Sequence, residues 1–189
     1  MLPVSTWGKH YVFQSKQPRD TIEVIRVLSL SDNTEVMLNG TVWGSPFGAN
    51  EHRDTIVYGT IHISADKPIL AADYSHEPYY NETFFYDSVG GSFLAVLPPL
   101  EQTYNDFTFY TSFDTLDAGY TEQFVQIVTE ESNNARITLD GQLVPTSYFR
   151  PVPGTVNGRT FVAGSVPVKA WVHRIQSPGI SDNGFVILA

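Results

Sequence analysis

Five histidines are the side chains of this sequence best suited to catalysis or metal binding: His10, His52, His62, His76 and His173. No two of them have the His-x-x-x-His or His-Glu-x-x-His spacing that places two imidazoles on one face of a helix. Neutral imidazole is also an ordinary amphipathic side chain. We therefore predict structural or solvent-exposed roles for all five. Alternation along Trp171–Arg174 predicts that His173 faces the same side as Trp171, partly buried and hydrogen-bonded.

Carboxylates and nucleophiles offer two further routes to chemistry. The pairs Asp114 with Asp117, and Glu130 with Glu131, would suit glycoside hydrolysis if they converged in a cleft. Residues 31–34 and 114–119 supply oxygen atoms for calcium, but neither loop follows the EF-hand pattern, and such side chains also build Asx turns. The sequence has no cysteine and no Gly-x-Ser-x-Gly elbow. We predict no catalytic, cofactor-binding or metal-binding residue.

The overall charge excludes two classes of partner. The 189-residue chain carries a net charge of −9, and its 11 Lys and Arg are scattered. Nucleic acid binding needs a clustered basic face, so nucleic acid is not expected as a partner. No apolar stretch approaches the roughly 18 residues that span a bilayer, so we expect no membrane insertion.

The elements that must position any site are β-strands. No window shows the apolar spacing of an amphipathic helix with caps. Period-two alternation is clear in Thr55–Ile63, Phe107–Tyr110 and Ala135–Leu139, and turn residues separate many short β-rich runs. This pattern predicts an all-β chain of antiparallel sandwiches. Looser loops are expected at residues 44–50 and 145–158, where rigid strands would position binding residues.

Two segments of the chain are similar in sequence. Residues 24–42 align with residues 125–143 without a gap, and each segment contains a tight-turn dipeptide, Asn39-Gly40 or Asp140-Gly141. These dipeptides favour the type I′ turn of a β-hairpin. The boundary is expected at Leu97–Leu100. We therefore predict two tandem antiparallel β-sandwich units related by internal duplication, residues 1–96 and 97–189.

Several short segments resemble one known family. They are Pro3–Lys9 followed by Tyr11–Phe13, Asp32–Gly40, Lys67–Ala71, Leu97–Gln102, and Leu139–Gly141 with Val172–Ile175. The chain resembles the IgG Fc-binding protein N-terminal domain family, although Tyr104-Asn105 replaces the Trp-Gly of the second unit. The resemblance implies a secreted or cell-surface β module of large mucus-associated or adhesive proteins. It identifies no residue set that would transfer Fc binding to this chain.

Two kinds of surface site follow from the sequence. Asn39-Gly40-Thr41 and Asn81-Glu82-Thr83 are N-glycosylation sequons, so we predict glycans on Asn81 and Asn39. Residues 74–86 are dense in aromatics, which are favoured at protein and glycan contact surfaces. Tyr79, Tyr80 and His76 are therefore the candidates for partner binding. In the alternative interpretation, the tyrosines only brace the loop.

These observations predict a non-enzymatic extracellular interaction or adhesion module within a larger secreted or cell-surface protein. Its partners would be proteins or glycans, or other copies of itself through exposed strand edges. No cofactor is expected. The alternative is a carbohydrate-active or metal-dependent enzyme on a β-sandwich scaffold, which would need convergent carboxylates or histidines in a pocket.

Overall fold

The computed structural model describes residues 3–15, 23–75, 93–112, 123–177 and 184–188. Within these ranges the only helices are three short 3-10 segments: η1 (Val4–Thr6), η2 (Glu131–Arg136) and η3 (Thr146–Tyr148). The remaining regular elements are β-strands, and all of their pairings are antiparallel. The predicted all-β class is confirmed.

The chain divides into two compact units, Met1–Pro99 and Leu100–Ala189. Unit 1 contains β1 (Gly8–Gln14), β2 (Glu23–Ser29), β3 (Val36–Leu38), β4 (Thr41–Val42), β5 (His52–Val57), β6 (Thr60–Ser75) and β7 (Phe93–Val96). Unit 2 contains β8 (Asp106–Thr111), β9 (Gln123–Glu130), β10 (Thr138–Leu139), β11 (Gln142–Leu143), β12 (Phe149–Pro151), β13 (Phe161–Val168), β14 (Trp171–Gln176) and β15 (Phe185–Leu188).

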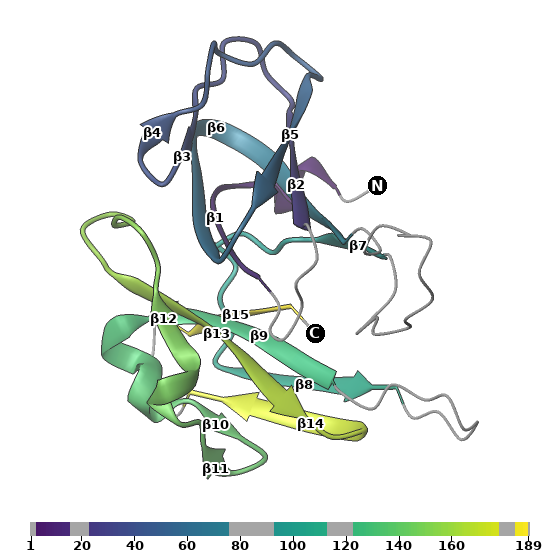
Figure 1. Cartoon of the computed structure of the whole chain (residues 1–189), viewed down its shortest axis with the longest axis vertical. Helices are drawn as coiled ribbons and strands as arrows, with labels where there is room; N and C mark the ends of the chain where they lie inside the picture. Colours follow the sequence, from purple (N-terminus) through teal and green to yellow (C-terminus); the bar gives the residue numbers. More distant parts are fainter. Residues whose placement is uncertain (1–2, 16–22, 76–92, 113–122, 178–183, 189) are drawn as a thin grey trace, which may run out of the picture. The chain divides into compact units, whose positions relative to one another are not determined.

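One long strand organises unit 1 (Figure 1). The first part of β6 pairs with β1 and β3, and its second part pairs with β2 and β7. Pro68 lies between the two parts, outside the register pairs of β2 and β3, so its missing N–H removes no bond from those ladders. The sequence predicted a sandwich for unit 1. The strands of unit 1 instead form one hydrogen-bonded sheet, and both parts of this sheet contain β6.

The apolar core of unit 1 comes from both parts of this sheet. Its fully buried side chains include Tyr11, Phe13, Ile25, Val27, Val36, Phe47, Ile63 and Ile69. In β2 the buried residues alternate with half-buried ones, as expected for a strand with one face on the core. The hydroxyl group of buried Tyr11 makes two hydrogen bonds: Oη donates to the Ile69 carbonyl at 2.6 Å and accepts from the Gly8 N–H at 2.9 Å.

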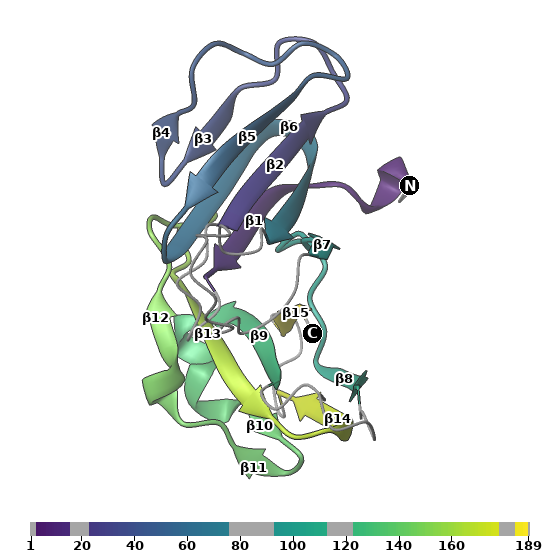
Figure 2. The ribbon, with the colours of Figure 1, turned by 45° about the vertical axis from the view of Figure 1, so that its right-hand side comes forward.

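Unit 2 has two four-stranded sheets, β11-β10-β14-β8 and β12-β13-β9-β15 (Figure 2). Its core draws on both: Phe109 and Ile175 come from the first sheet, and Ile127, Val162 and Phe185 from the second. Burial of large apolar side chains between two sheets is the usual driving force of a β-sandwich. This unit therefore has the sandwich arrangement that the alternation predicted.

The two units share a set of strand pairings. The order β1-β6-β3-β4 in unit 1 matches β8-β14-β10-β11 in unit 2, and the pairings of β2 with β5 and β6 match those of β9 with β13 and β15. Both predicted tight turns have positive φ at both central residues, 51° and 79° for Asn39-Gly40 and 52° and 78° for Asp140-Gly141. Common ancestry of the units stays a prediction.

The gapless alignment is wrong by one residue in its first strand. Ile69 pairs with Gly8 and Ser29, whereas Phe185 pairs with Tyr104 and Thr129. Ser29 therefore corresponds to Thr129, although the gapless alignment matches it with Glu130. The hairpin turns still match, so the additional residue of unit 2 lies between strand and hairpin, where η2 forms.

Two strand predictions also need correction. The run Thr55–Ile63 is interrupted at Tyr58-Gly59, because Gly59 has a φ of 77° and ends β5. The run Ala135–Leu139 begins as part of η2, and the strand that follows, β10, is only Thr138–Leu139.

Candidate functional site

In each unit, a connection of two residues joins two consecutive strands. Tyr58-Gly59 joins β5 to β6, and Lys169-Ala170 joins β13 to β14. The register pairs Phe13 with Ile61 in unit 1 and Phe109 with His173 in unit 2. Counting back two residues from each pair makes Trp171 the counterpart of Gly59. Both have positive φ, 113° for Trp171 and 77° for Gly59.

A tryptophan is an unusual residue for this backbone conformation. Glycine adopts positive φ without steric penalty, whereas a bulky side chain there places Cβ against the backbone. The other non-glycine residues with positive φ in the described part of the chain are Asn33, Asn39, Asn50, Asp140 and Asn157, whose short polar side chains tolerate it. A residue strained in this way costs about 1–3 kcal/mol and is found most often at functional sites.

The Trp171 side chain is exposed to solvent. Strand alternation would place it on the core side with His173, but it is 58% exposed while His173 is 7% exposed. His173 is buried and hydrogen-bonded, as predicted, whereas Trp171 at the start of β14 lacks the burial that alternation would give it. Val172, 63% exposed, lies directly opposite Tyr110, 58% exposed. We call Trp171, Val172 and Tyr110 the Trp171 platform.

Polar side chains follow the platform along the same strands. Arg174 pairs in register with Thr108, and its guanidinium binds the Asp106 carboxylate, with Nε donating to Oδ1 at 2.7 Å. Nη2 of Arg174 also donates to Asp106 Oδ2, as does Gln176 Nε2 at 3.2 Å. The hydrogen bonds from Arg174 hold the pKa of Asp106 below its ordinary value. The Trp171 platform is thus followed along β8 and β14 by charged and hydrogen-bonding side chains.

A buried network lies behind Trp171. The Lys169 carbonyl accepts from Thr111 Oγ1 at 2.6 Å and faces Nε2 of His173 at 2.6 Å. Thr111 Oγ1 also lies 3.2 Å from the Trp171 carbonyl oxygen. On the other side of the ring, His173 Nδ1 lies 2.7 Å from Asp140 Oδ2. The Lys169 and Trp171 carbonyls are therefore both contacted by Thr111 of the neighbouring strand β8, and the Lys169 carbonyl is also contacted by His173.

Burial disfavours the charged form of His173, but the hydrogen bonds to its partners favour that form more strongly. Desolvation alone would lower the pKa of His173, whereas the hydrogen bonds to Asp140 and to the Lys169 carbonyl raise it above the ordinary value. For Asp140, burial would raise the pKa, but hydrogen bonds from His173 and from the Arg174 N–H lower it overall. Both shifts favour an ionised pair at neutral pH.

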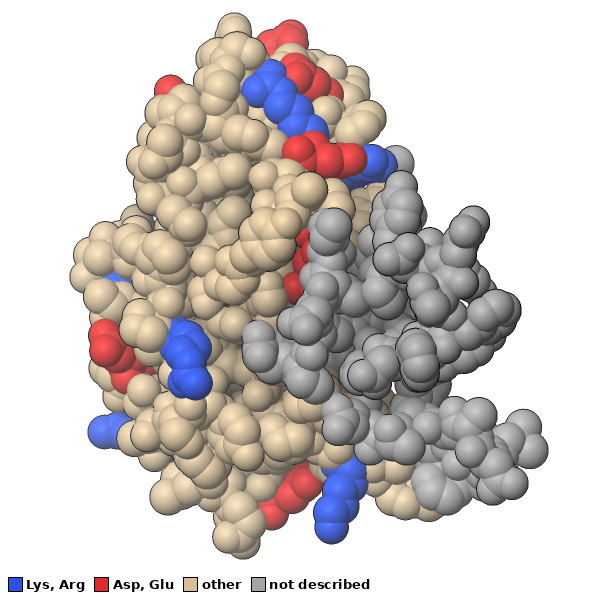
Figure 3. Space-filling model, viewed as in Figure 1, with Lys and Arg blue, Asp and Glu red and all other residues tan. Residues whose placement is uncertain are grey.

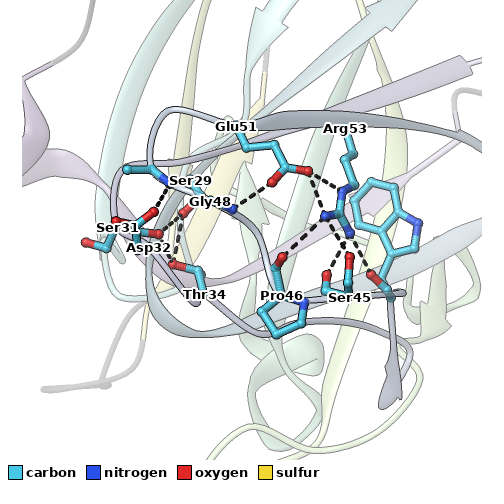
Figure 4. Close-up of polar contacts among 11 residues, drawn as sticks. Ser29, Ser31, Asp32, Thr34, Ser45, Pro46, Gly48, Glu51 and Arg53 are labelled. Carbon is cyan, nitrogen blue, oxygen red and sulfur yellow. Dashed lines mark hydrogen bonds and ion pairs between the residues drawn. The ribbon is translucent and has the colours of Figure 1, made fainter.

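A second ordered cluster holds the loop at residues 44–50 in unit 1 (Figure 4). Arg53 donates to the Ser45 carbonyl through Nη1 at 2.7 Å and to Glu51 Oε1 through Nε at 2.7 Å, and its guanidinium lies 4.1 Å from the Phe47 ring centre. Glu51 Oε2 accepts the Gly48 N–H at 2.6 Å, which lowers the pKa of this carboxyl. These groups stabilise the loop, so it is less loose than the sequence predicted.

The turn at residues 31–34 also uses its oxygen atoms internally. Asp32 Oδ1 accepts the Ala49 N–H at 2.8 Å, and Thr34 Oγ1 donates to the Ser31 carbonyl at 2.7 Å. Asp32 therefore bonds to the loop at residues 44–50 rather than to its own backbone two residues on, as an Asx turn would require. Across the described residues, no group of three His, Asp or Glu side chains is placed to hold a metal ion. Asp114 and Asp117 lie outside those residues.

Two histidines form a pair that the sequence did not predict. Nδ1 of His10 lies 3.3 Å from Nε2 of His62, and their rings stack with centres 5.6 Å apart. The two residues are 52 positions apart, and only the pairing of β1 with β6 brings them together. By register they correspond to Asp106 and Arg174, the ion pair of unit 2.

Only one of the predicted site residues lies in the described part of the chain. His76, Tyr79, Tyr80 and Asn81 fall outside it. Asn39 is exposed at its hairpin turn, and its Oδ1 accepts the His62 N–H at 2.8 Å. An N-glycan attaches to the other atom of the amide, Nδ2. No sequence signal indicated the positive φ at Trp171, which stands at the start of an alternating run.

Comparisons with known proteins add a family. The whole chain, residues 1–189, matches the family model described as IgGFc binding protein. No curated protein matches the chain. Among solved structures, the apo form of the lectin of Pleurotus ostreatus is similar at 11% identity and a TM-score of 0.27, covering 94% of this chain and 68% of that one. A likeness this weak carries no argument.

The family supports a non-enzymatic binding module. No helix among the described residues has the length and apolar character needed to cross a membrane. Because the family model spans every residue, and the resemblance noted in the sequence points to the same family, the chain belongs to the IgGFc-binding protein family.

Proposed function

We propose that the chain is a non-enzymatic extracellular interaction module, part of a larger secreted or cell-surface protein, and that the Trp171 platform contacts its partner. The observation that carries this proposal is the strained, exposed Trp171 at a place where unit 1 uses glycine. A sequence under no functional demand would not keep this cost, because glycine would relieve it.

The chemistry of the platform suits a protein or a glycan. Trp and Tyr offer large rigid surfaces with a polar tip, and both are enriched at binding hot spots. The neighbouring Arg174 and Asp106 supply donors and acceptors that fix orientation. On the face shown in Figure 3, the Lys and Arg side chains do not gather into a basic patch, which argues against nucleic acid as the partner.

The alternative enzyme interpretation has less support. It requires carboxylates or histidines that converge on a substrate. Asp106, Asp140 and Glu51 are each bound to a cation or a backbone N–H of their own unit. These carboxylates therefore serve the fold, and the family description also names binding.

Binding by the 189-residue chain to a glycan array and to immobilised proteins tests the proposal, with IgG Fc among the proteins because the family is named for it. For whatever partner binds, Trp171→Ala should weaken the affinity at least about 30-fold, as expected for a hot-spot residue. Tyr58→Ala is the matched control, because Tyr58 is 78% exposed at the corresponding connection of unit 1.

Equal loss of affinity in both variants, or no loss in Trp171→Ala, would remove the platform from the binding site. The two arms of the screen also decide between a protein and a glycan. Turnover of a bound glycan would instead support the enzyme alternative.

A further inference from the structure

We propose that protonated His173 is a positioning residue: its ring, anchored by Asp140, holds the Lys169 carbonyl and so keeps Trp171 turned outward in the platform. This inference rests on the proposed function for its biological meaning. Its geometry stands independently, in the contacts of His173 at 2.7 Å to Asp140 and 2.6 Å to Lys169.

The two partners of the ring determine its protonation. Nδ1 faces a carboxylate oxygen and Nε2 faces a backbone carbonyl oxygen, and neither oxygen carries a proton when Asp140 is ionised. Only imidazolium can donate to both, because neutral imidazole has a single N–H. The observed contacts therefore require the charged ring.

The surroundings of the ring are known from each element that packs against it. From the β10–β11 turn it meets the Asp140 carboxylate, and from β8 it meets the Phe109 ring, with centres 5.4 Å apart. From the β13–β14 connection it meets the Lys169 carbonyl. The nearest cation along its own strand is Arg174, whose guanidinium is bound to Asp106. Among the described residues, Asp140 is the charged group bonded to the ring.

A comparison with unit 1 indicates the role of the pair formed by His173 and Asp140. The counterparts of Trp171, His173 and Asp140 by register and turn position are Gly59, Ile61 and Asn39. Asn39 and Asp140 make the same bonds to the following strand: Oδ1 accepts from His62 N–H at 2.8 Å in one unit and from Arg174 N–H at 2.9 Å in the other. The ion pair is present only in the unit in which the strained tryptophan follows the connection.

Loss of the proton would release this support. The Nδ1–H next to the carboxylate is the proton that the pair retains, so Nε2 becomes the deprotonated atom. Its lone pair would then face the Lys169 oxygen and repel it. The Lys169 carbonyl would keep the hydrogen bond from Thr111 Oγ1, and Trp171 would relax toward the core side that alternation favours.

The sign of the pH dependence follows from the two shifts. The pKa of His173 is raised, so its support is complete below the ordinary value of 6.5 and is lost as the pH rises through the folded-state pKa. The pKa of Asp140 is lowered, so its contribution is complete above the ordinary value of 3.8 and is lost as the pH falls through its own pKa. Trp171 is presented between these limits.

Two measurements on the full chain test the proposal without any partner. In ¹⁵N spectra at neutral pH, the His173 imidazole should show two protonated nitrogens. In a Trp7→Phe/Trp43→Phe background, Trp171 emission and iodide quenching should change between pH 6 and 10 with the same midpoint as His173, and His173→Gln should abolish this titration.

Asp140→Asn is the matched variant, because unit 1 has an asparagine at the same turn. It should lower the midpoint by about one pH unit or more, since an opposite charge is removed. A neutral His173 at pH 7, a flat emission profile, or an unmoved midpoint in Asp140→Asn would overturn the proposal. If the titration is found but Trp171→Ala still binds the partner, the proposed function fails and the positioning role stands.

Discussion

Trp171 shows at the scale of one residue how an unusual backbone conformation lowers stability. A glycine at this position would release the strain of a φ of 113°, and an alanine would keep part of it through its Cβ. In most strands the order is reversed, because glycine has more conformational entropy to lose.

We predict that Trp171→Gly unfolds at a higher urea concentration than Trp171→Ala. The difference in free energy of unfolding should be about 1 kcal/mol. Both variants lose the indole and its contacts equally, so the comparison isolates the backbone. An alanine variant that is as stable as the glycine variant, or more so, would show that Trp171 is not strained.

Turn chemistry could be predicted residue by residue, but pairing could not. Asn39-Gly40 and Asp140-Gly141 form the expected turns because each dipeptide carries its own φ preference. The His10–His62 contact and the exposure of Trp171 depend on strands far apart in the chain. No local pattern contains that information.

Among the elements, β15 is tied to the segment before β8 by a close backbone approach. Tyr104 and Phe185 exchange two backbone hydrogen bonds, each 2.8 Å long. A Cβ built on Gly184 would overlap the Tyr104 carbonyl. Glycine is therefore needed here for space rather than for its φ.

We predict that Gly184→Ala destabilises the chain by about 1–3 kcal/mol, because the backbone of Tyr104 cannot move without breaking this bridge. Gly48→Ala is the control: its Cβ would lie 3.5 Å from Glu51 Oε2, an ordinary contact. Thermal unfolding of both variants measures the difference. Equal melting temperatures would contradict the close approach.

The strands were easier to predict than their ends. Alternation identified β8 because buried and more exposed residues alternate along that strand. It misplaced the ends at Tyr58-Gly59 and at η2, where turn geometry rather than hydrophobicity decides. The sharing of β6 between two parts of unit 1 was also missed, since periodicity does not reveal partners.

At the scale of the whole molecule, an extracellular origin can be tested through its sequons. After secretion from a eukaryotic host, the intact mass should show glycans on Asn39 and Asn81, the first at an exposed turn. Thr41→Ala should remove one glycan and leave the bond between Asn39 and the His62 N–H intact. Thr83→Ala is the companion change for Asn81. An unmodified chain would count against secretion.

In unit 1 one continuous strand makes pairings that two separate strands make in unit 2. β6 pairs with β1, β2, β3 and β7, while in unit 2 the counterparts of its pairings with β1, β2 and β3 are divided between β14 and β15, with residues 177–184 between them. A pulling force applied to β1 therefore reaches β2 along one peptide backbone. In unit 2 the equivalent path must follow a longer stretch of chain. Mechanical tension on β1 would thus pass to β2 through the backbone of a single strand.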